Sequence, residues 1–221
     1  MNIYFDTEFT GVHKDTTLIS LGCVTENGQT FYAEFRDYDR SKCDNWIMEN
    51  VISKLRLVND ESIPEIASMH ENDTSLSVCG DTAYIRKEFK RWLSNFDSVQ
   101  FVTDVGHYDF VLLIDLFGTA FDLPANVSPC YHDINQDIAL IGNISDRDAF
   151  NISRKDLLLN ITNKVCQHNA LDDALMVKDI YEQINDYMVT FRYAAERVVP
   201  ANKDFDGDVM NIFGMKIASI V

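Results

Sequence analysis

Basic residues are scarce in this chain: of its 221 residues, 19 are Lys or Arg, against 35 that are Asp or Glu. The formal net charge of −16 argues against a protein that holds nucleic acid nonspecifically through positive charge alone. It does not exclude an enzyme that acts on nucleic acid. Clustered carboxylates bind divalent cations, and these cations then present positive charge to phosphate groups.

The chain also lacks long apolar runs, and its cysteines lack the spacing of a metal site. No run approaches the roughly 20 apolar residues of a membrane-spanning helix, and the start of the chain lacks the basic segment of a secretory signal. An odd number of cysteines without a C-x-x-C pair argues against a disulfide framework or a zinc site. We therefore expect a cytoplasmic protein with reduced thiols and no membrane partner. The cysteines are Cys23, Cys43, Cys79, Cys130 and Cys166.

The order of β-prone and helical segments predicts the fold class. The composition, 46% hydrophobic and 24% charged, is that of a globular protein with one sizeable core. β-prone runs come first, and an Asn-Gly pair at positions 27 and 28 predicts a hairpin. This order favours an α/β fold of the ribonuclease H-like kind, a mixed sheet with three antiparallel strands first, flanked by helices. We expect strands over 2–6, 17–25, 30–35 and 99–103, and helices over 44–55, 85–96, 108–117 and 171–188.

The domain organisation follows from the less regular stretches. Residues 57–82 are polar and without periodicity, so we expect residues 57–84 to be an insertion. The core domain should cover residues 1–190. Residues 191–221 would then form a C-terminal extension of unknown role.

Two acids end the first predicted strand. Residues i and i+2 of a strand point to the same face, so Asp6 and Glu8 should project together from an apolar element. A pair of buried carboxylates is costly unless positive charge accompanies it, and such a pair suits Mg²⁺ or Mn²⁺. The alternative interpretation is a solvated strand end.

Two predicted helices carry further candidate acids. Asp109 lies on the packed side of its helix, although an acid in a first turn can also serve only the helix dipole, and Asp104 competes for the same role. Asp173 shares the apolar side of the last long helix, whereas Asp172 lies on a more solvated side. His168 precedes Asp173 by five residues and is a candidate general base.

Together these motifs resemble the DEDDh branch of the 3′→5′ exonucleases, which includes oligoribonuclease, RNase T and polymerase proofreading subunits. The match comprises D-T-E-F over 6–9, Y-D-F over 108–110 and H-x-x-x-x-D over 168–173. The chain is still more similar to the polyadenylate-specific exoribonucleases, the RNase AS group. That similarity adds F-Y-A at 31–33 and W-I-x-x-x-V-I-x-K-L over 46–55.

The resemblance implies a ribonuclease H-like fold and a metal-dependent 3′→5′ exoribonuclease. Such an enzyme hydrolyses phosphodiester bonds from the 3′ end of single-stranded nucleic acid, here RNA, and releases nucleoside monophosphates. Asp6, Glu8, Asp109 and Asp173 would hold two Mg²⁺ or Mn²⁺ ions, which a two-metal mechanism places roughly 3.5–4 Å apart. His168 would be the base. A homodimer is implied by the resemblance alone.

Substrate contacts and rival functions stay open. Phe9 and Thr10 follow Glu8, where the resemblance places the terminal nucleotide, and Phe9 could equally be a core residue. A basic cluster on one helix could bind RNA or merely face solvent; it contains Lys87, Lys90 and Arg91. The alternatives are a DNA exonuclease on the same fold and a catalytically inert nucleic-acid or partner-binding module. The presence of all five expected active-site groups speaks against the inert module.

Overall fold

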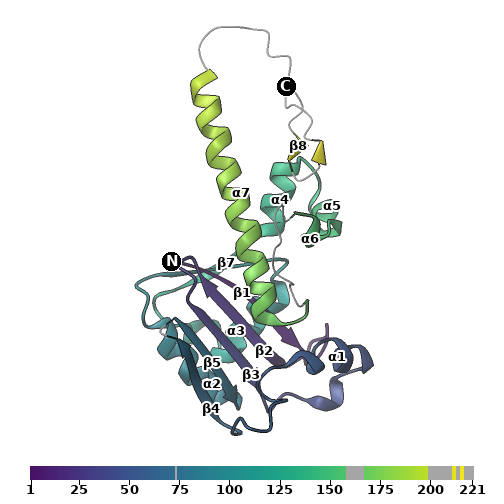
Figure 1. Cartoon of the computed structure of the whole chain (residues 1–221), viewed down its shortest axis with the longest axis vertical. Helices are drawn as coiled ribbons and strands as arrows, with labels where there is room; N and C mark the ends of the chain where they lie inside the picture. Colours follow the sequence, from purple (N-terminus) through teal and green to yellow (C-terminus); the bar gives the residue numbers. More distant parts are fainter. Residues whose placement is uncertain (73, 158–166, 199–210, 213–214, 217–221) are drawn as a thin grey trace. The chain divides into compact units, whose positions relative to one another are not determined.

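The computed structural model describes residues 1–72, 74–157, 167–198, 211–212 and 215–216 (Figure 1). The chain divides into two compact units. The first comprises Met1–His132 and Val165–Lys178, and the second comprises Asp133–Lys164 and Asp179–Val221. Every residue of the predicted active site belongs to the first unit.

A mixed seven-stranded sheet organises the first unit, in the order β4-β5-β3-β2-β1-β6-β7. β1 pairs antiparallel with β2, and β2 with β3, whereas β1 and β6 are parallel, as are β3 and β5. The prediction of a mixed sheet that opens with antiparallel strands is therefore confirmed. The strands are β1 (Asn2–Phe9), β2 (Leu18–Thr25), β3 (Thr30–Phe35), β4 (Ala67–Asn72), β5 (Ser75–Gly80), β6 (Val99–Thr103) and β7 (Val127–Asp133).

The predicted hairpin lies between β2 and β3. Gly28 adopts a φ of +79°, a left-handed conformation that glycine takes without steric cost. Its N–H donates to the Thr25 carbonyl and closes the turn. β1 is longer than expected and reaches Phe9, because Glu8 still pairs with Ser20 of β2 before the register shifts.

Helices cover both faces of the sheet, and alternate residues of each strand face one layer or the other. Phe31 of β3 packs against α2 (Thr82–Leu93) in the main core, which also includes residues of α3 (His107–Phe117). In the view of Figure 1 these two helices lie behind the sheet. Tyr32 packs instead with Leu57 and Leu171. Short helices complete this unit: η1 (Arg40–Lys42), α1 (Asn45–Asn50), η2 (Ile52–Lys54) and η3 (Ala120–Asp122).

Side-chain caps set where two helices begin. The Asp44 carboxylate accepts from the Ile47 N–H at 2.8 Å, and α1 begins at the residue after Asp44. The Asp81 carboxylate accepts from the Tyr84 N–H at 2.8 Å, and α2 therefore begins three residues before the expected position 85. Caps depend on single residues rather than on periodicity, so periodicity alone places helix ends poorly.

The expectation that residues 57–82 are irregular is wrong for residues 67–72 and 75–80, which are strands. β4 and β5 form a hairpin within it, and β5 adds to the edge of β3. Five of the six β5 residues are buried. The alternation of polar and apolar residues in S-L-S-V was an available signal for this strand, but it spans only four positions before Cys79 and Gly80. The prediction that residues 57–84 are an insertion, and the boundary at residue 190, remain predictions.

The second unit contains short helices and the later part of α7. Its elements are α4 (Ile134–Gly142), α5 (Asp146–Asn151), α6 (Arg154–Leu157), α7 (Ala170–Val198) from residue 179 onward, and the paired strands β8 (Asn211–Ile212) and β9 (Met215–Lys216). Arg154 joins these helices by donating to the Ala149 carbonyl and to Asn135 Oδ1. Most of the predicted extension 191–221 lies outside the described residues. Among the helices that the structure describes, none has the length and apolar character needed to cross a membrane.

Candidate active site

The five predicted catalytic and metal-binding residues all line one cleft of the first unit. The cleft has a volume of about 610 Å³. β1 contributes Asp6 and Glu8, the first turn of α3 contributes Asp109, and the turn that enters α7 contributes His168, with Asp173 just inside that helix. Segments that are distant in the sequence thus bring four carboxylates and one imidazole to one place.

Asp109 is anchored directly to β1. Its Oδ1 accepts hydrogen bonds from the Thr7 hydroxyl at 2.6 Å and from the Thr7 N–H at 3.1 Å. The side chain is buried, with 8% of its residue surface exposed. Asp104, the alternative acid, lies close enough to raise the pKa of Asp6, but it is Asp109 that lines the cleft. Asp109 therefore has a place in the site beyond any interaction with the helix dipole.

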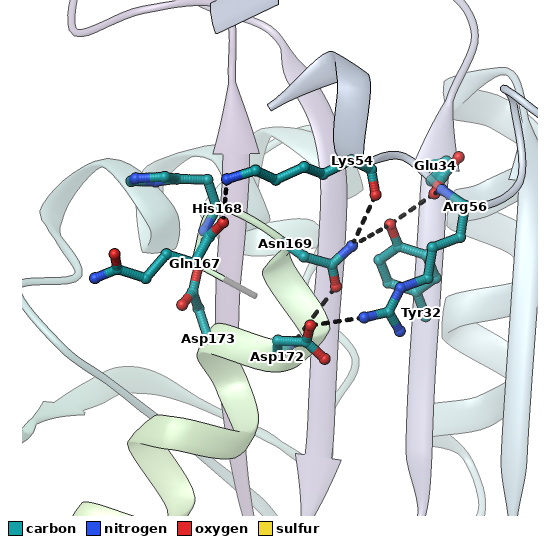
Figure 2. Close-up of polar contacts among 9 residues, drawn as sticks. All are labelled: Tyr32, Glu34, Lys54, Arg56, Gln167, His168, Asn169, Asp172 and Asp173. Carbon is teal, nitrogen blue, oxygen red and sulfur yellow. Dashed lines mark hydrogen bonds and ion pairs between the residues drawn. The ribbon is translucent and has the colours of Figure 1, made fainter. Parts of the chain in front are cut away.

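The start of α7 separates Asp173 from Asp172. Asp173 Oδ2 accepts from the His168 N–H at 2.8 Å, which holds acid and histidine together. Asp172 Oδ2 instead pairs with the Arg56 guanidinium at 2.7 Å. Figure 2 shows the two carboxylates pointing in different directions. The periodicity argument for Asp173 as the inward acid agrees with this arrangement.

Glu8, His168 and Asp173 form the tightest group of possible metal ligands found among the described residues. One ligand atom from each lies within 4.8 Å of the others. Carboxylate oxygens are the ligands that Mg²⁺ and Mn²⁺ prefer, and an imidazole nitrogen can either bind a metal or move a proton. The donor set therefore fits a hard divalent cation.

Burial raises the pKa values of all four acids, and repulsion from neighbouring carboxylates adds to this at Asp6, Glu8 and Asp173. Burial raises the pKa of Asp6 well above its ordinary value, and the charges of Asp109, Glu8, Asp173 and Asp104 add to this. Glu8 has a pKa of about 8, chiefly because it is buried and then because Asp173 and Asp109 repel its charge, while Lys54 partly offsets these effects. Burial also raises the pKa of Asp109 and brings that of Asp173 to about 6. Such a cluster favours a bound cation, because positive charge relieves the repulsion.

In metal-free buffer we expect thermal stability to fall as the pH rises from about 4.5 towards 8. Unfolded carboxyl groups ionise near their ordinary values, whereas folded Asp173 and Glu8 keep their protons until about pH 6 and pH 8. Between these values the folded state binds more protons, so raising the pH favours unfolding. The melting temperature in EDTA should decline across this window, and Mg²⁺ or Mn²⁺ should restore it.

Glu8→Gln is the matched variant for this measurement, since it removes the group with the pKa of about 8 and nearly preserves its shape. Its melting temperature in EDTA should depend less on pH above about 6 than that of the unaltered protein. A wild-type melting temperature that stays level or rises over the same window would contradict the repulsive cluster.

The predicted substrate-binding residues differ in their surroundings. Phe9 lines the cleft and stacks on Tyr108, with ring centroids 5.5 Å apart, and it also packs against the main core. Thr10 lines the cleft as well, but it is fully buried and its hydroxyl accepts from the Thr17 N–H at 3.0 Å. The role of both residues toward a nucleotide stays a prediction.

Two of the three residues of the basic cluster on α2, Lys90 and Arg91, contact other side chains of the protein. The Lys90 ammonium lies 5.6 Å from the centre of the Phe117 ring, and Arg91 pairs with Glu88 at 2.8 Å. These contacts favour the interpretation that the cluster is a solvated helix face rather than an RNA-binding surface.

Sequence reasoning did not place Trp46 in the site. Its ring meets the His168 imidazole edge-on, with centroids 4.9 Å apart, and half of its surface is exposed at the cleft. Lys54 was missed as well, and its ammonium donates to the Gln167 carbonyl at 2.7 Å. Both belong to the W-I-x-x-x-V-I-x-K-L pattern over 46–55, which was the available signal.

The amino-acid sequence is similar to those of known exoribonucleases. The Rv2179c-like 3′-5′ exoribonuclease domain matches residues 1–185. The 3′-5′ exoribonucleases Rv2179c and MT2234.1, from the H37Rv and CDC 1551 strains of Mycobacterium tuberculosis, are each 28% identical over 138 residues, 62% of this chain and 73% of theirs.

A solved structure shows the fold. It describes 3′-end specific recognition of a histone mRNA stem-loop by a 3′-exonuclease, and it superposes with a TM-score of 0.51 at 10% identity. The match covers 84% of this chain and 63% of that one, which is just under two thirds of its length. The ribonuclease H-like exonuclease fold expected from the sequence is thereby confirmed. Because the family domain matches residues 1–185 of the 221 residues, the chain belongs to the Rv2179c-like 3′-5′ exoribonuclease family and is a 3′→5′ exoribonuclease, a hydrolase.

Proposed function

We propose that the cleft removes nucleoside monophosphates one at a time from the 3′ end of single-stranded RNA and needs two divalent cations, Mg²⁺ or Mn²⁺, to do so. The observation that carries this proposal is the gathering of Asp6, Glu8, Asp109 and Asp173 with His168 around one cleft. Without a bound cation, the clustered acids destabilise one another, as their raised pKa values indicate. Beside an imidazole they suit metal-assisted hydrolysis of a phosphodiester.

In this proposal, the acids bind the cations and the histidine transfers a proton. Asp6, Glu8, Asp109 and Asp173 would hold the cations and exclude bulk water from the base of the cleft. The bound cations supply charge neutralisation for the phosphate, activation of a water molecule and stabilisation of the leaving oxygen. His168 would accept the proton of the attacking water at an imidazole nitrogen, which its place beside Glu8 and Asp173 permits.

The size of the cleft and the small number of basic residues in the sequence support binding of only a short segment of the substrate. Its volume of about 610 Å³ is within the range typical of small-molecule sites. Phe9 and Trp46 offer aromatic surface at its wall, and stacking on a base contributes roughly 1–3 kcal/mol. We therefore propose that only the last nucleotides of the RNA are held. Homodimerisation stays a prediction from the resemblance alone.

A degradation assay on matched RNA and DNA oligomers, labelled at either end, tests this function. With Mg²⁺ or Mn²⁺, 5′-labelled RNA should yield a ladder of one-nucleotide steps, and the 3′-labelled strand should lose its label as a mononucleotide. EDTA should abolish both. A poly(A) arm measures base preference. Endonucleolytic fragments, or equal activity in EDTA, would contradict the proposal, and a preference for DNA would overturn its choice of RNA.

A further inference from the structure

A further buried carboxylate, outside the cleft, takes no part in the proposed chemistry. Glu34 of β3 is fully buried, and its oxygens accept from the backbone N–H groups of residues 56, 57 and 58, the last two at 2.9 and 2.7 Å. The Tyr32 hydroxyl donates to the same carboxylate at 2.6 Å. A buried charge is tolerated when it is hydrogen-bonded in this way, and the bonds fix its partners in place.

Tyr32 extends this network to the residue that follows His168. The Asn169 Nδ2 group donates to the Tyr32 hydroxyl oxygen at 3.0 Å, and Asn169 is itself buried, with 2% of its surface exposed. Burial, together with the nearby Glu34 carboxylate, raises the pKa of Tyr32, so its hydroxyl keeps the proton that it donates. Figure 2 shows Glu34, Tyr32 and Asn169 in a continuous line that ends at the start of α7.

The sheet register explains how this line reaches the cleft. Gly22 of β2 pairs with Asp6 on one side and with Tyr32 on the other, so these positions form one row across a face of the sheet. A Cβ atom on Gly22 would lie 2.2 Å from the Ala170 carbonyl oxygen. Only glycine therefore lets the first turn of α7 rest on the sheet between the metal-binding acids and Tyr32.

The backbone of His168 needs such support. Its φ of +63° lies in the left-handed region, which is unfavourable for a residue with a side chain and persists where the surroundings hold it. On one side of His168, the Lys54 ammonium holds the Gln167 carbonyl at 2.7 Å. On the other side, Asn169 is held by its hydrogen bond to the Tyr32 hydroxyl. The imidazole between them is thereby held at the cleft.

We propose that Glu34, Tyr32 and Asn169 are positioning residues of the exoribonuclease: they hold the backbone of His168 and so keep its imidazole at the cleft. The inference rests on the proposed role of His168 as the base. It assigns a function to the F-Y-A-E segment over 31–34, which touches none of the reacting atoms. Loss of the network should lower kcat more than it changes KM, because the catalytic group is displaced while the substrate wall stays intact.

Tyr32→Phe is the sharpest test, because it removes one oxygen atom and preserves the ring. We expect kcat on 5′-labelled RNA to fall about 10- to 100-fold, the usual effect of a lost outer-shell partner, with KM changed less than about threefold. Asn169→Ala should behave in the same way. Thr103→Val is the matched control, since it removes a fully buried hydroxyl that has no hydrogen-bond partner among the described residues.

Two further measurements separate positioning from mere stability. In a double-mutant cycle with His168→Gln, the combined loss in kcat should be much smaller than the product of the single losses. The ring resonance of His168, identified by its absence in His168→Gln, should shift or broaden in Tyr32→Phe and stay unchanged in Thr103→Val. Multiplying losses, or an unchanged resonance, would overturn the proposal.

These readouts also distinguish failure of this inference from failure of the proposed function. Normal kcat in His168→Gln would remove the base from the mechanism and overturn the catalytic part of the inference. The resonance of His168 would still report whether Tyr32 holds it. A large loss in His168→Gln with normal kcat in Tyr32→Phe would overturn the positioning role and leave the proposed base in place.

Discussion

Replacing Asp6 with asparagine is expected to lower kcat by about 10³-fold or more, the loss typical when a charge-stabilising group is removed from an active site. Asp6 lies on β1, and its pKa is raised by the charges of four other acids, Glu8, Asp109, Asp173 and Asp104. No other acid of the cleft has as many charged neighbours that shift its pKa. Its loss should therefore loosen cation binding as a whole rather than at one ligand.

The same variant should be more stable than the unaltered protein in EDTA. Removing one charge from a cluster of buried, mutually repelling carboxylates relieves a cost to the folded state. The melting temperature in EDTA should therefore rise, while the increase produced by Mn²⁺ should shrink. Calorimetric titration with Mn²⁺, together with the RNA ladder assay, measures both effects.

Asp172→Asn is the control, because Asp172 is one residue from Asp173 and pairs instead with Arg56, whose side chain is exposed. We expect its kcat within about threefold of the unaltered enzyme, since exposed ion pairs contribute little. An Asp6→Asn enzyme that keeps a tenth or more of its kcat would remove Asp6 from the metal-binding set.

Replacing His168 with glutamine is expected to lower kcat by about 10²- to 10⁴-fold, the usual contribution of a positioned general base. Because the acids remain, KM for RNA and the affinity for Mn²⁺ should change little. A parallel His168→Ala variant leaves space in the cleft, and added imidazole should restore part of its activity. Single-turnover hydrolysis of 5′-labelled RNA isolates the chemical step.

The proximity of His168 to Glu8 and Asp173 makes a second outcome informative. These three residues offer ligand atoms within 4.8 Å of one another, so a strong loss of Mn²⁺ affinity in His168→Gln would identify a metal ligand instead of a base. His70→Gln, on β4 and outside the cleft, is the matched histidine control and should keep normal activity.

The candidate site could be predicted from local patterns because each catalytic motif lies within one element or in the turn that leads into it. The two acids of β1 are two residues apart on a strand, and Asp109 and Asp173 occupy the packed sides of their helices. Two-residue and 3.6-residue periods are visible in a sequence without any tertiary information. The Asn-Gly pair at positions 27 and 28, an equally local signal, predicted the hairpin at Gly28.

Features that depend on pairing between distant segments could not be found in this way. β5 was missed because its pairing partner β3 lies 45 positions away where Thr30 meets Ser75, and its own alternation of polar and apolar residues spans only four positions. The contact of Trp46 with His168 likewise joins segments that share no local pattern.

The sequence by itself determined the chemistry of this protein: acids and a histidine at spacings that favour metal-assisted hydrolysis, within a fold of mixed sheet and helices. Tertiary structure alone decided how that chemistry is held in place. The row from Asp6 through Gly22 to Tyr32, and the link from Glu34 to Asn169, arise from strand register and from helix packing on the sheet. Register and packing are set by the whole core at once, because burial rewards only the arrangement in which all the apolar faces meet.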